Sequence, residues 1–370
     1  MSKRFIITVI TLIVIGVGAA VAIFLAKGYT ISPQEKRIVG TGIITVSSEP
    51  DAASVYIDGH LTTATNATIS SLTPKIYSVK VIKEGFIPWE KKLEVKEGLV
   101  TEVKVTLFPA IPTIYPLTFT GVSKPVLSPD GSKLAYIVPT QTQSGEPNKK
   151  GGVWVWTLIG NQPIAFARSA EPHQIASSSL ADFSQADLQW SADSKQVLAT
   201  VGKNNYLLES DRLNNEPRDI TPILQATLDS WKEDIQAKDE ARILAIQDLG
   251  LRKIASDSAQ LYWSPDETKM MVKKEPTSAL YVYDLESKKE YPLPDARAHL
   301  WLPDSRHIIL VEEETISLID FDGTNKAIIF AGKFEDSFVF PWPDSSRLVI
   351  ISSLPTPTAS EPNLYGINLR

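Results

Sequence analysis

The chain has no cysteine among its 370 residues, and it has only four histidines, at positions 60, 173, 299 and 307. Without cysteine it can form neither disulfide frameworks nor thiolate metal sites, and it has no cysteine nucleophile. The histidines are too scattered to form a metal-binding motif, and no phosphate-binding loop, nucleophile elbow or zinc-protease motif occurs. We therefore expect no catalytic residue, no metal and no other cofactor.

Basic charge is also scarce, since 37 Lys and Arg face 43 Asp and Glu, which gives a net charge of -6. This acidic balance argues against a nucleic-acid partner, because binding to phosphates needs a basic surface. The residues are 43% hydrophobic and 22% charged, so the chain is not a disordered one. Its length allows two or three folded domains.

Long hydrophobic runs are confined to one segment, the 22 uncharged residues from Phe5 to Ala26. A helix of this length would measure about 33 Å, close to the roughly 30 Å hydrocarbon core of a bilayer. Because Lys3 and Arg4 precede the run, residues 1–27 are expected to be a cytoplasmic stub and a transmembrane anchor, with the bulk of this single-pass membrane protein extracytoplasmic. The alternative is a cleaved signal peptide, since Ala20-Val21-Ala22 resembles a cleavage site.

After a polar linker over 28–41, residues 42–109 show short segments in which apolar and polar residues alternate. This period of two predicts half-buried antiparallel strands, with the turn Asp58-Gly59 joining two of them in a hairpin and Glu97-Gly98 a second such turn. The apolar positions of these strands are Ile44, Val46, Val55, Ile57, Tyr77, Val79, Val81, Leu93, Val95, Val103, Val105 and Leu107.

The same region resembles the PEGA domain in the segments SSEPDAASVYIDG (47–59), TPKIYSV (73–79) and KEGFIPW (83–89). Ala52 and Lys75 stand where the PEGA pattern has glycine. The resemblance implies a small extracytoplasmic β-sandwich without known catalytic residues, acting as a spacer or a surface-binding module.

Five similar turn segments follow, with aspartates 63, 73, 38 and 40 residues apart. A unit of about 40 residues is typical of a four-stranded propeller blade. Each aspartate is expected to cap a turn, which is a structural role. The five aspartates are Asp130, Asp193, Asp266, Asp304 and Asp344. Further strands follow each turn, and the fourth strand of the first unit is expected at 163–168, while 113–118 is expected to complete the last blade.

The repeated motif resembles the TolB-like, WD-type propeller repeat over residues 110–370. The predicted fold class is thus all-β: an N-terminal transmembrane helix, a small PEGA-like β-sandwich and a β-propeller of five four-stranded blades, or six if residues 241–255 form a degenerate blade. From the strand order we expect all long insertions (139–152, 169–187, 222–260 and 354–363) on the face opposite the repeated turns.

One insertion, residues 222–240, has helical periodicity, with Thr221 as the expected N-cap and Pro222 in the first turn. Its apolar stripe includes Leu228, Trp231 and Ile235. The stripe either packs on the propeller or helps to anchor a partner, and these three residues are the candidate binding residues.

These features favour a membrane-anchored extracytoplasmic binding or scaffolding protein of the cell envelope that is not an enzyme. Its expected partners are the membrane, through the N-terminal helix, and a cell-wall polymer or another envelope protein, through the insertion-rich face. The alternative is a propeller hydrolase or lyase acting on glycans, with acidic residues at the central channel.

Overall fold

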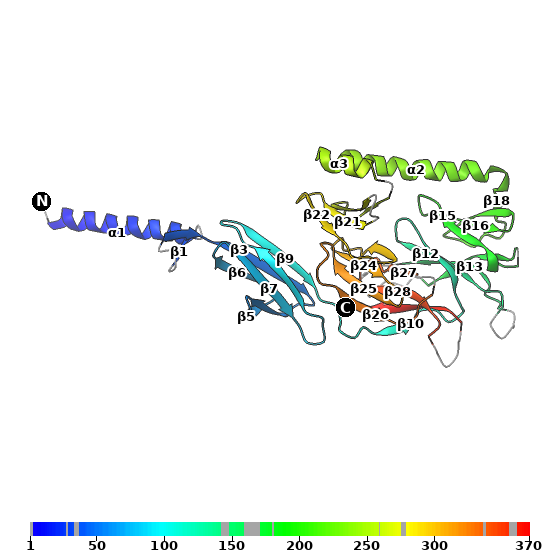
Figure 1. Ribbon diagram of the computed structural model, residues 1–370, viewed down its shortest axis with the longest axis horizontal. Helices are drawn as coiled ribbons and strands as arrows, with labels where there is room; N and C mark the ends of the chain where they lie inside the picture. Colours follow the sequence, from blue (N-terminus) through cyan, green and yellow to red (C-terminus); the bar gives the residue numbers. More distant parts are fainter. Residues whose placement is uncertain are drawn as a thin grey trace. The chain divides into compact units, whose positions relative to one another are not determined.

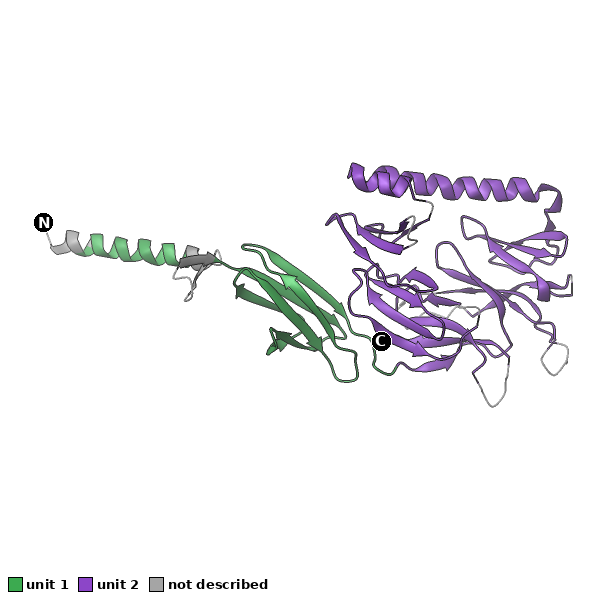
Figure 2. Cartoon of the chain, in the orientation of Figure 1, with its two compact units in different colours: residues 1–111 green, residues 112–370 purple. Residues whose placement is uncertain are grey.

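The computed structural model describes residues 3–26, 29–32, 37–141, 148–158, 171–179, 181–258, 260–274, 279–335, 338–354 and 361–370. The chain divides into two compact units, Met1–Ile111 and Pro112–Arg370 (Figure 2). Each unit has its own hydrophobic core, so each is described by itself.

The N-terminal helix α1 spans Lys3–Ala26. Within the described part of the chain, no helix is both long enough and apolar enough to cross a membrane. The predicted transmembrane anchor, and with it the single-pass membrane localisation, is therefore wrong.

Two short strands, β1 (Tyr29–Ser32) and β2 (Arg37–Gly40), form an antiparallel hairpin within the segment predicted as a linker. The β-sandwich follows, with one sheet in the order β6-β3-β9 and the other in the order β5-β4-β7-β8 (Figure 1). Its strands are β3 (Gly42–Glu49), β4 (Ser54–Ile57), β5 (His60–Ala64), β6 (Ala67–Leu72), β7 (Ile76–Ile82), β8 (Trp89–Glu94) and β9 (Val100–Thr106).

The alternating apolar residues predicted for this unit form its core, which confirms the half-buried strands. Asp58 and Gly59 both have positive φ, 49° and 82°, as a two-residue hairpin turn requires, and they join β4 to β5. Two expectations were wrong. Strands β3 and β9 pair in parallel, and Glu97-Gly98 lies in a connection between the two sheets instead of a hairpin.

The second unit contains five antiparallel four-stranded sheets. In the first four, the order of the strands in the sheet is their order in the chain, whereas the fifth includes one strand from the start of the unit. Sheet 1 consists of β11 (Ser123–Leu127), β12 (Lys133–Val138), β13 (Gly152–Thr157) and β14 (His173–Ser177). Sheet 2 consists of β15 (Asp187–Trp190), β16 (Gln196–Val201), β17 (Asn204–Glu209) and β18 (Arg218–Asp219). Sheet 3 consists of β19 (Leu261–Trp263), β20 (Lys269–Lys274), β21 (Ala279–Asp284) and β22 (Lys289–Pro292).

Sheet 4 consists of β23 (Ala298–Trp301), β24 (His307–Val311), β25 (Thr315–Asp320) and β26 (Ala327–Ala331). Sheet 5 consists of β27 (Val339–Pro341), β28 (Arg347–Ser352), β29 (Asn363–Asn368) and, from the start of the unit, β10 (Ile114–Pro116). The pairing of β10 with β29 confirms that the segment 113–118 completes the last sheet. The expected strand at 163–168 lies outside the described residues, and β14, which contains His173, is the fourth strand of sheet 1.

The insertion between sheets 2 and 3 is helical. It contains the short 3-10 helix η2 (Thr221–Ile223), the 22-residue α2 (Leu224–Ala245) and α3 (Leu249–Ser256). The sixth blade considered for residues 241–255 is therefore absent from these residues, which are helical apart from the connection between α2 and α3. Thr221 does not cap α2, because its hydroxyl oxygen instead accepts a hydrogen bond from the backbone N–H of Asn205 (2.8 Å).

Apolar clusters join most neighbouring sheets. One cluster joins sheets 1 and 2, another joins sheets 5 and 1, and a third joins sheets 3 and 4. The other side of sheet 3 packs instead on the helical insertion, where Leu251 and Ala255 of α3 contact Met270 and Val272 of β20. No apolar cluster of the described residues joins sheets 2 and 3 or sheets 4 and 5, so the arrangement is propeller-like but the ring of sheets is not closed.

Candidate functional site

The turn between the first two strands of each propeller sheet is built around its motif aspartate. In all five turns a carboxylate oxygen of this residue accepts the backbone N–H two positions later, at distances of 2.9 to 3.1 Å. The residue immediately after each motif aspartate has a positive φ of 58° to 69°. In an antiparallel sheet these turns and the connections between the third and fourth strands lie on the same face, which we name the turn face.

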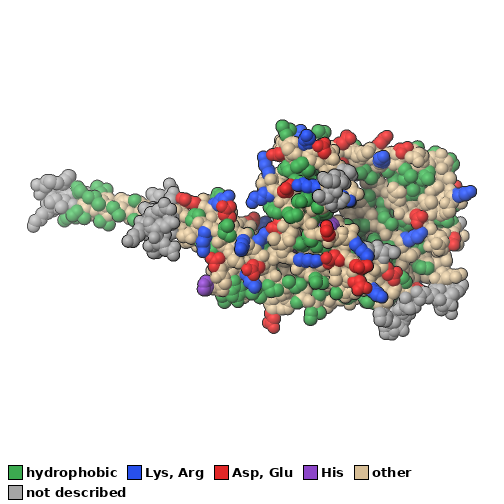
Figure 3. Space-filling model, viewed as in Figure 1, with side chains coloured by type: hydrophobic (Ala, Val, Ile, Leu, Met, Phe, Trp, Pro, Cys, Tyr) green, Lys and Arg blue, Asp and Glu red, His purple; other side chains and the backbone are tan. Residues whose placement is uncertain are grey.

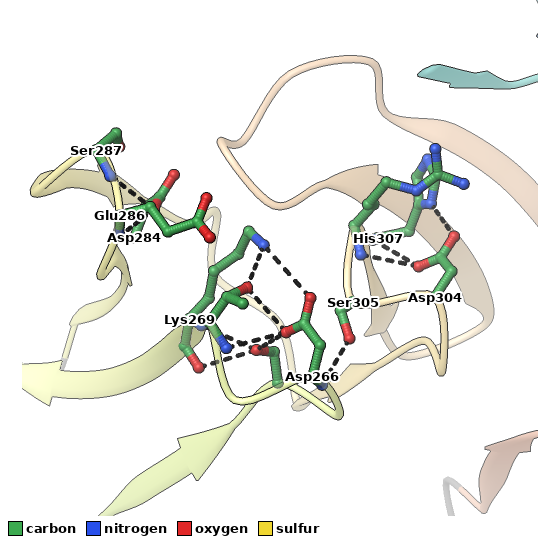
Figure 4. A network of polar contacts seen from close by, with 11 residues as sticks. Asp266, Lys269, Asp284, Glu286, Ser287, Asp304, Ser305 and His307 are labelled. Carbon is green, nitrogen blue, oxygen red and sulfur yellow. Dashed lines mark hydrogen bonds and ion pairs between the residues drawn. The ribbon is translucent and has the colours of Figure 1, made fainter. Parts of the chain in front are cut away.

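Two pairs of neighbouring turns are joined by the same two hydrogen bonds. Between sheets 1 and 2, Asp130 N–H donates to Ser194 Oγ (3.3 Å) and Trp190 Nε1 donates to the carbonyl of Val126 (2.8 Å). Between sheets 3 and 4, the same two bonds join Asp266 to Ser305 (3.0 Å) and Trp301 to Tyr262 (3.1 Å). Figure 4 shows the Asp266–Ser305 bond linking two turns. We name each such pair an inter-sheet staple.

We call the contact between two neighbouring sheets a seam. Among the described residues, the seam between sheets 2 and 3 has neither bond of the staple. At the position of Ser194 and Ser305, sheet 3 carries Glu267, which pairs with Arg242 of α2 (Nε to Oε1, 2.8 Å). Trp263 occupies the position of Trp190 and Trp301, but its Nε1 atom is buried without a hydrogen-bond partner among the described residues. The helical insertion therefore interrupts a repeat that the flanking seams preserve.

A second repeated position lies three residues after the motif aspartate, where four of the five sheets carry a basic side chain. Lys133 Nζ reaches the carbonyl of Ser194 in sheet 2 (3.0 Å), and Lys269 Nζ lies 4.9 Å from the ring centre of Phe321 at the end of β25. The other two residues are His307 and Arg347. These residues were missed at the sequence level, although aligning the five motifs would have found them.

His307 is the most buried of these groups, with 4% of its surface exposed. Its Nδ1 lies 2.6 Å from Asp304 Oδ2 and its Nε2 lies 3.4 Å from Asp320 Oδ1. Burial alone would lower the pKa of His307, but the hydrogen bonds with the two carboxylates raise it to about 9. For Asp304 the two effects have the opposite signs. Burial raises its pKa, but the hydrogen bond with His307, together with smaller electrostatic effects, lowers it by more, so the pKa of Asp304 lies below the usual value.

The helix α2 reaches the turn face, contrary to the expected placement of the 222–260 insertion on the opposite face. It begins at the far end of sheet 2, where η2 contacts Asn205, but Lys238 Nζ reaches the carbonyl of Ala192 in the turn of sheet 2 (3.3 Å). Because a 22-residue helix is about 33 Å long, it can span from one face to the other. The predicted insertion 169–187 contains a strand of sheet 1, since β14 (His173–Ser177) is the fourth strand of that sheet.

A cavity of about 870 Å³ lies between α2 and the turn face. All five sheets contribute to its walls, and α2 contributes Ile235, Lys238, Asp239 and Arg242, four residues on one side of the helix. The space-filling view is hollowed beneath α2 (Figure 3). The aromatic residues in the walls are Tyr262, Trp263, Trp301, Phe338 and Phe340.

Two carboxylates line the cavity, and both already have partners. Asp239 pairs with Arg242 (3.3 Å), and Asp130 accepts hydrogen bonds from Ser128 and Ser132 within its turn. Partial burial raises the pKa of Asp130, but these hydrogen bonds outweigh it and keep the pKa below the usual value. A general acid for glycan cleavage needs a raised pKa, so Asp130 does not fit that role.

Of the predicted binding residues, Ile235 alone lines the cavity, with 47% of its surface exposed. Leu228 lies two turns before it on α2 and Trp231 one turn before it, and both are half-buried. The wall residues contributed by the strands, such as Tyr262 and Trp301, were missed because strand periodicity does not reveal which positions face the centre of a ring. Within the described residues, no group of His, Asp and Glu side chains could hold a metal ion.

Comparison with known proteins most directly supports the predicted PEGA-like domain in the first unit. Residues 41–111 match the PEGA domain family model. The match covers the β-sandwich and not the propeller sheets. No curated protein matches the chain.

Solved structures that match part of the chain include three with low identity. A protein described as TolB from Agrobacterium tumefaciens matches with 18% identity and a TM-score of 0.24, covering 65% of this chain and 76% of that one. TolB from Acinetobacter baumannii matches with 12% identity and a TM-score of 0.24, covering 79% of this chain and 59% of that one. The β-propeller domain of Cps50 (Swd1) from Myceliophteria thermophila matches with 11% identity and a TM-score of 0.21, covering 65% of each chain. Similarities this weak carry no argument about function.

Proposed function

We propose that the chain is a non-enzymatic binding protein that holds a cell-wall polymer in the cavity between α2 and the turn face. The observation that carries the proposal is the convergence of five sheets and a helix on one aromatic-lined cavity of about 870 Å³. Cavities of this size with a few polar groups are typical of ligand sites. The flat faces of Tyr and Trp side chains suit a large polymer that carries both apolar and polar groups.

A binding role is favoured over catalysis because the two carboxylates in the walls are already engaged. Asp130 accepts a hydrogen bond from the backbone N–H of Ser132 within its turn, and Asp239 pairs with Arg242. At the α2 wall, the Lys238 ammonium group gives one hydrogen bond to Ala192 and has further donors that suit a ligand with carboxylate or carbonyl oxygens. Amide and carboxylate groups of this kind are common in cell-wall polymers that contain peptides.

The test is co-sedimentation of the full chain with purified peptidoglycan sacculi. Tyr262 is the residue to change, because it lies in the cavity wall and 47% of its surface is exposed, so Tyr262→Ala removes a contact surface at little cost to folding. Phe119→Ala is the matched control, since Phe119 is an aromatic residue with 65% of its surface exposed and is not part of the cavity wall.

We expect the wild-type chain and Phe119→Ala to sediment with the sacculi and Tyr262→Ala to remain in solution. Equal retention of all three proteins would remove the cavity as the binding site. If no protein is retained, the cell-wall polymer is excluded and another protein becomes the partner to seek. Release of soluble fragments from the sacculi would contradict the non-enzymatic role.

A further inference from the structure

The residue that precedes each motif aspartate lines the cavity in all five sheets. These residues, which we name the proline belt, are Pro129, Ala192, Pro265, Pro303 and Pro343. Because proline has no backbone N–H, four of the five sheets offer an apolar side chain and no hydrogen-bond donor at this position. Sheet 2 departs from the pattern, since it carries Ala192 there.

Most donors in the walls formed by the strands and turns are already engaged. The hydroxyls of Ser128 and Ser264 donate to the motif aspartates of their own turns (2.6 and 2.7 Å). Trp301 Nε1 donates within a staple, and Trp263 Nε1 is too deeply buried for a ligand to reach it. These walls therefore present mainly apolar and aromatic surface to a ligand.

The two cationic side chains in the walls differ in what compensates their charge. The guanidinium group of Arg242 lies between two carboxylates, 2.8 Å from Glu267 and 3.3 Å from Asp239. Lys238 has no ion-pair partner among the described residues, and its Nζ contacts a neutral acceptor, the carbonyl of Ala192 (3.3 Å). Since an ammonium group has three donors, two donors of Lys238 remain for a ligand.

Lys238 lies at the one place where the proline belt is interrupted. Its ammonium group reaches Ala192, the member of the belt that is not proline. A positive charge beside apolar walls with few competing donors interacts more strongly with an anion than it would in open water. A carboxylate at this position gains a charge-assisted hydrogen bond, which is stronger than the bond that a neutral amide oxygen would accept.

We infer that Lys238 makes the cavity selective for polymers with free carboxylates, so that an amidated polymer of the same shape binds more weakly. This inference rests on the proposed function and specifies the charge of its ligand. A carboxylate of the polymer pairs with Lys238 Nζ, while its apolar parts lie on the proline belt and on Tyr262. Lys238 is thus a specificity-determining residue of the binding site.

The test is co-sedimentation of the full chain with two forms of the same peptidoglycan sacculi. One form is untreated, and in the other the peptide carboxylates have been converted to amides with a carbodiimide and ammonia. Lys238→Gln removes the charge in the cavity wall, and Lys238→Glu reverses it. Lys232→Gln and Lys232→Glu are the matched controls, because Lys232 is exposed on the same helix and does not line the cavity.

We expect untreated sacculi to bind the wild-type chain about threefold to tenfold more tightly than amidated sacculi. Lys238→Gln should bind both forms equally, and Lys238→Glu should prefer the amidated form because its carboxylate repels those of the untreated polymer. Both Lys232 variants should keep the wild-type preference. They change the net charge of the chain by the same amounts, so they report any effect of long-range electrostatics.

Equal binding of both forms by the wild-type chain would overturn this inference and leave the proposed function standing. A loss of binding in Lys238→Gln that is equal for the two forms would also overturn it, because Lys238 would then act by holding α2 on sheet 2. A preference that is lost in Lys232→Gln as well would assign it to the net charge of the chain instead of the cavity. If the wild-type chain binds neither form, the proposed function fails and this inference fails with it.

Discussion

At the scale of single residues, the buried group formed by His307, Asp304 and Asp320 is the clearest electrostatic feature of the protein. A protonated imidazole with the pKa of His307, about 9, is held between two carboxylates in the interior of sheet 4. Removing one partner from a buried ionic group leaves the others uncompensated, which commonly costs about 3–5 kcal/mol.

His307→Gln is therefore expected to lower the free energy of unfolding by about 3 kcal/mol at neutral pH. The folded-state pKa of His307 lies above its ordinary value of 6.5, so its stabilising effect is complete below about pH 6.5 and is lost as the pH rises through about 9. Urea unfolding at several pH values should show the difference between wild type and His307→Gln shrinking across this range. The pKa of Asp304 is lowered, so its own contribution is lost only when the pH falls below about 4. A difference that stays constant from pH 6 to pH 10 would contradict the charged state of His307.

The residue that departs from the PEGA pattern at position 52 gives a second prediction. Ala52 is exposed and has a φ of 54°, the left-handed region in which glycine costs less than any residue with a β-carbon. Ala52→Gly should raise the stability of the β-sandwich by about 1 kcal/mol. The adjacent Ala53 is fully buried and is not among the residues with positive φ, so Ala53→Gly should lower stability by a similar amount. Hydrogen exchange of β7 in the full chain measures both, and equal effects of the two changes would contradict the role of backbone conformation.

At the scale of elements, the core strands of the β-sandwich could be predicted because one face of each is buried and alternation records this in the sequence. Inner propeller strands such as β24 and β28 are buried on both faces and could be predicted as short apolar runs that follow the turns. The turns could also be predicted, since Asp-Gly at 58–59 and the five motif aspartates have local conformational reasons to be where they are. The path of α2 could not be predicted from the strand order. Strand order fixes the face on which the insertion begins and ends, but a helix of about 33 Å can cross to the other face between those points.

The cavity could not be predicted for a related reason. Its wall residues come from five sheets, and only the assembled ring brings Tyr262, Trp301 and Phe340 together. The candidate residue Ile235 was found because helical periodicity selects one side of α2. Lys238 and Arg242 lie on the same side, but they are charged, so an apolar stripe does not include them.

The staples between sheets can be tested with matched tryptophan changes. Trp301 and Trp263 occupy equivalent positions and are both half-buried, but only Trp301 Nε1 donates a hydrogen bond, to Tyr262. Replacing either residue with phenylalanine removes a similar volume, so the difference between them reports the hydrogen bond. We expect Trp301→Phe to cost about 1 kcal/mol more than Trp263→Phe in urea unfolding, because an unpaired buried donor is lost in the second case. Equal costs would show that Trp263 Nε1 is bonded in solution.

At the scale of the whole molecule, the second unit is held together by the return of its last strand to its first. Strand β10 pairs with β29, and this brings residues more than 240 positions apart into contact. Thr118 Oγ1 donates to Asn363 Oδ1 (3.1 Å), and Gly121 N–H donates to the same oxygen (3.2 Å). Sheet 5 thus joins the two ends of the unit through the pairing of β10 with β29.

Asn363→Ala is expected to lower the stability of the second unit by about 2 kcal/mol, because Asn363 is 3% exposed and its loss leaves Gly121 N–H buried without an acceptor. Asn368→Ala is the control, since Asn368 also bridges the two ends, through Thr113 Oγ1 (2.8 Å), but at an exposed position where water can replace the bond. Its cost should be below about 0.5 kcal/mol. Each unit has its own core, so hydrogen exchange of β7 in the sandwich should not change in either variant, whereas exchange of β28 should quicken in Asn363→Ala. If both variants weakened the second unit equally, the buried network would not be what closes sheet 5. If β7 changed as well, the two units would unfold together instead of independently.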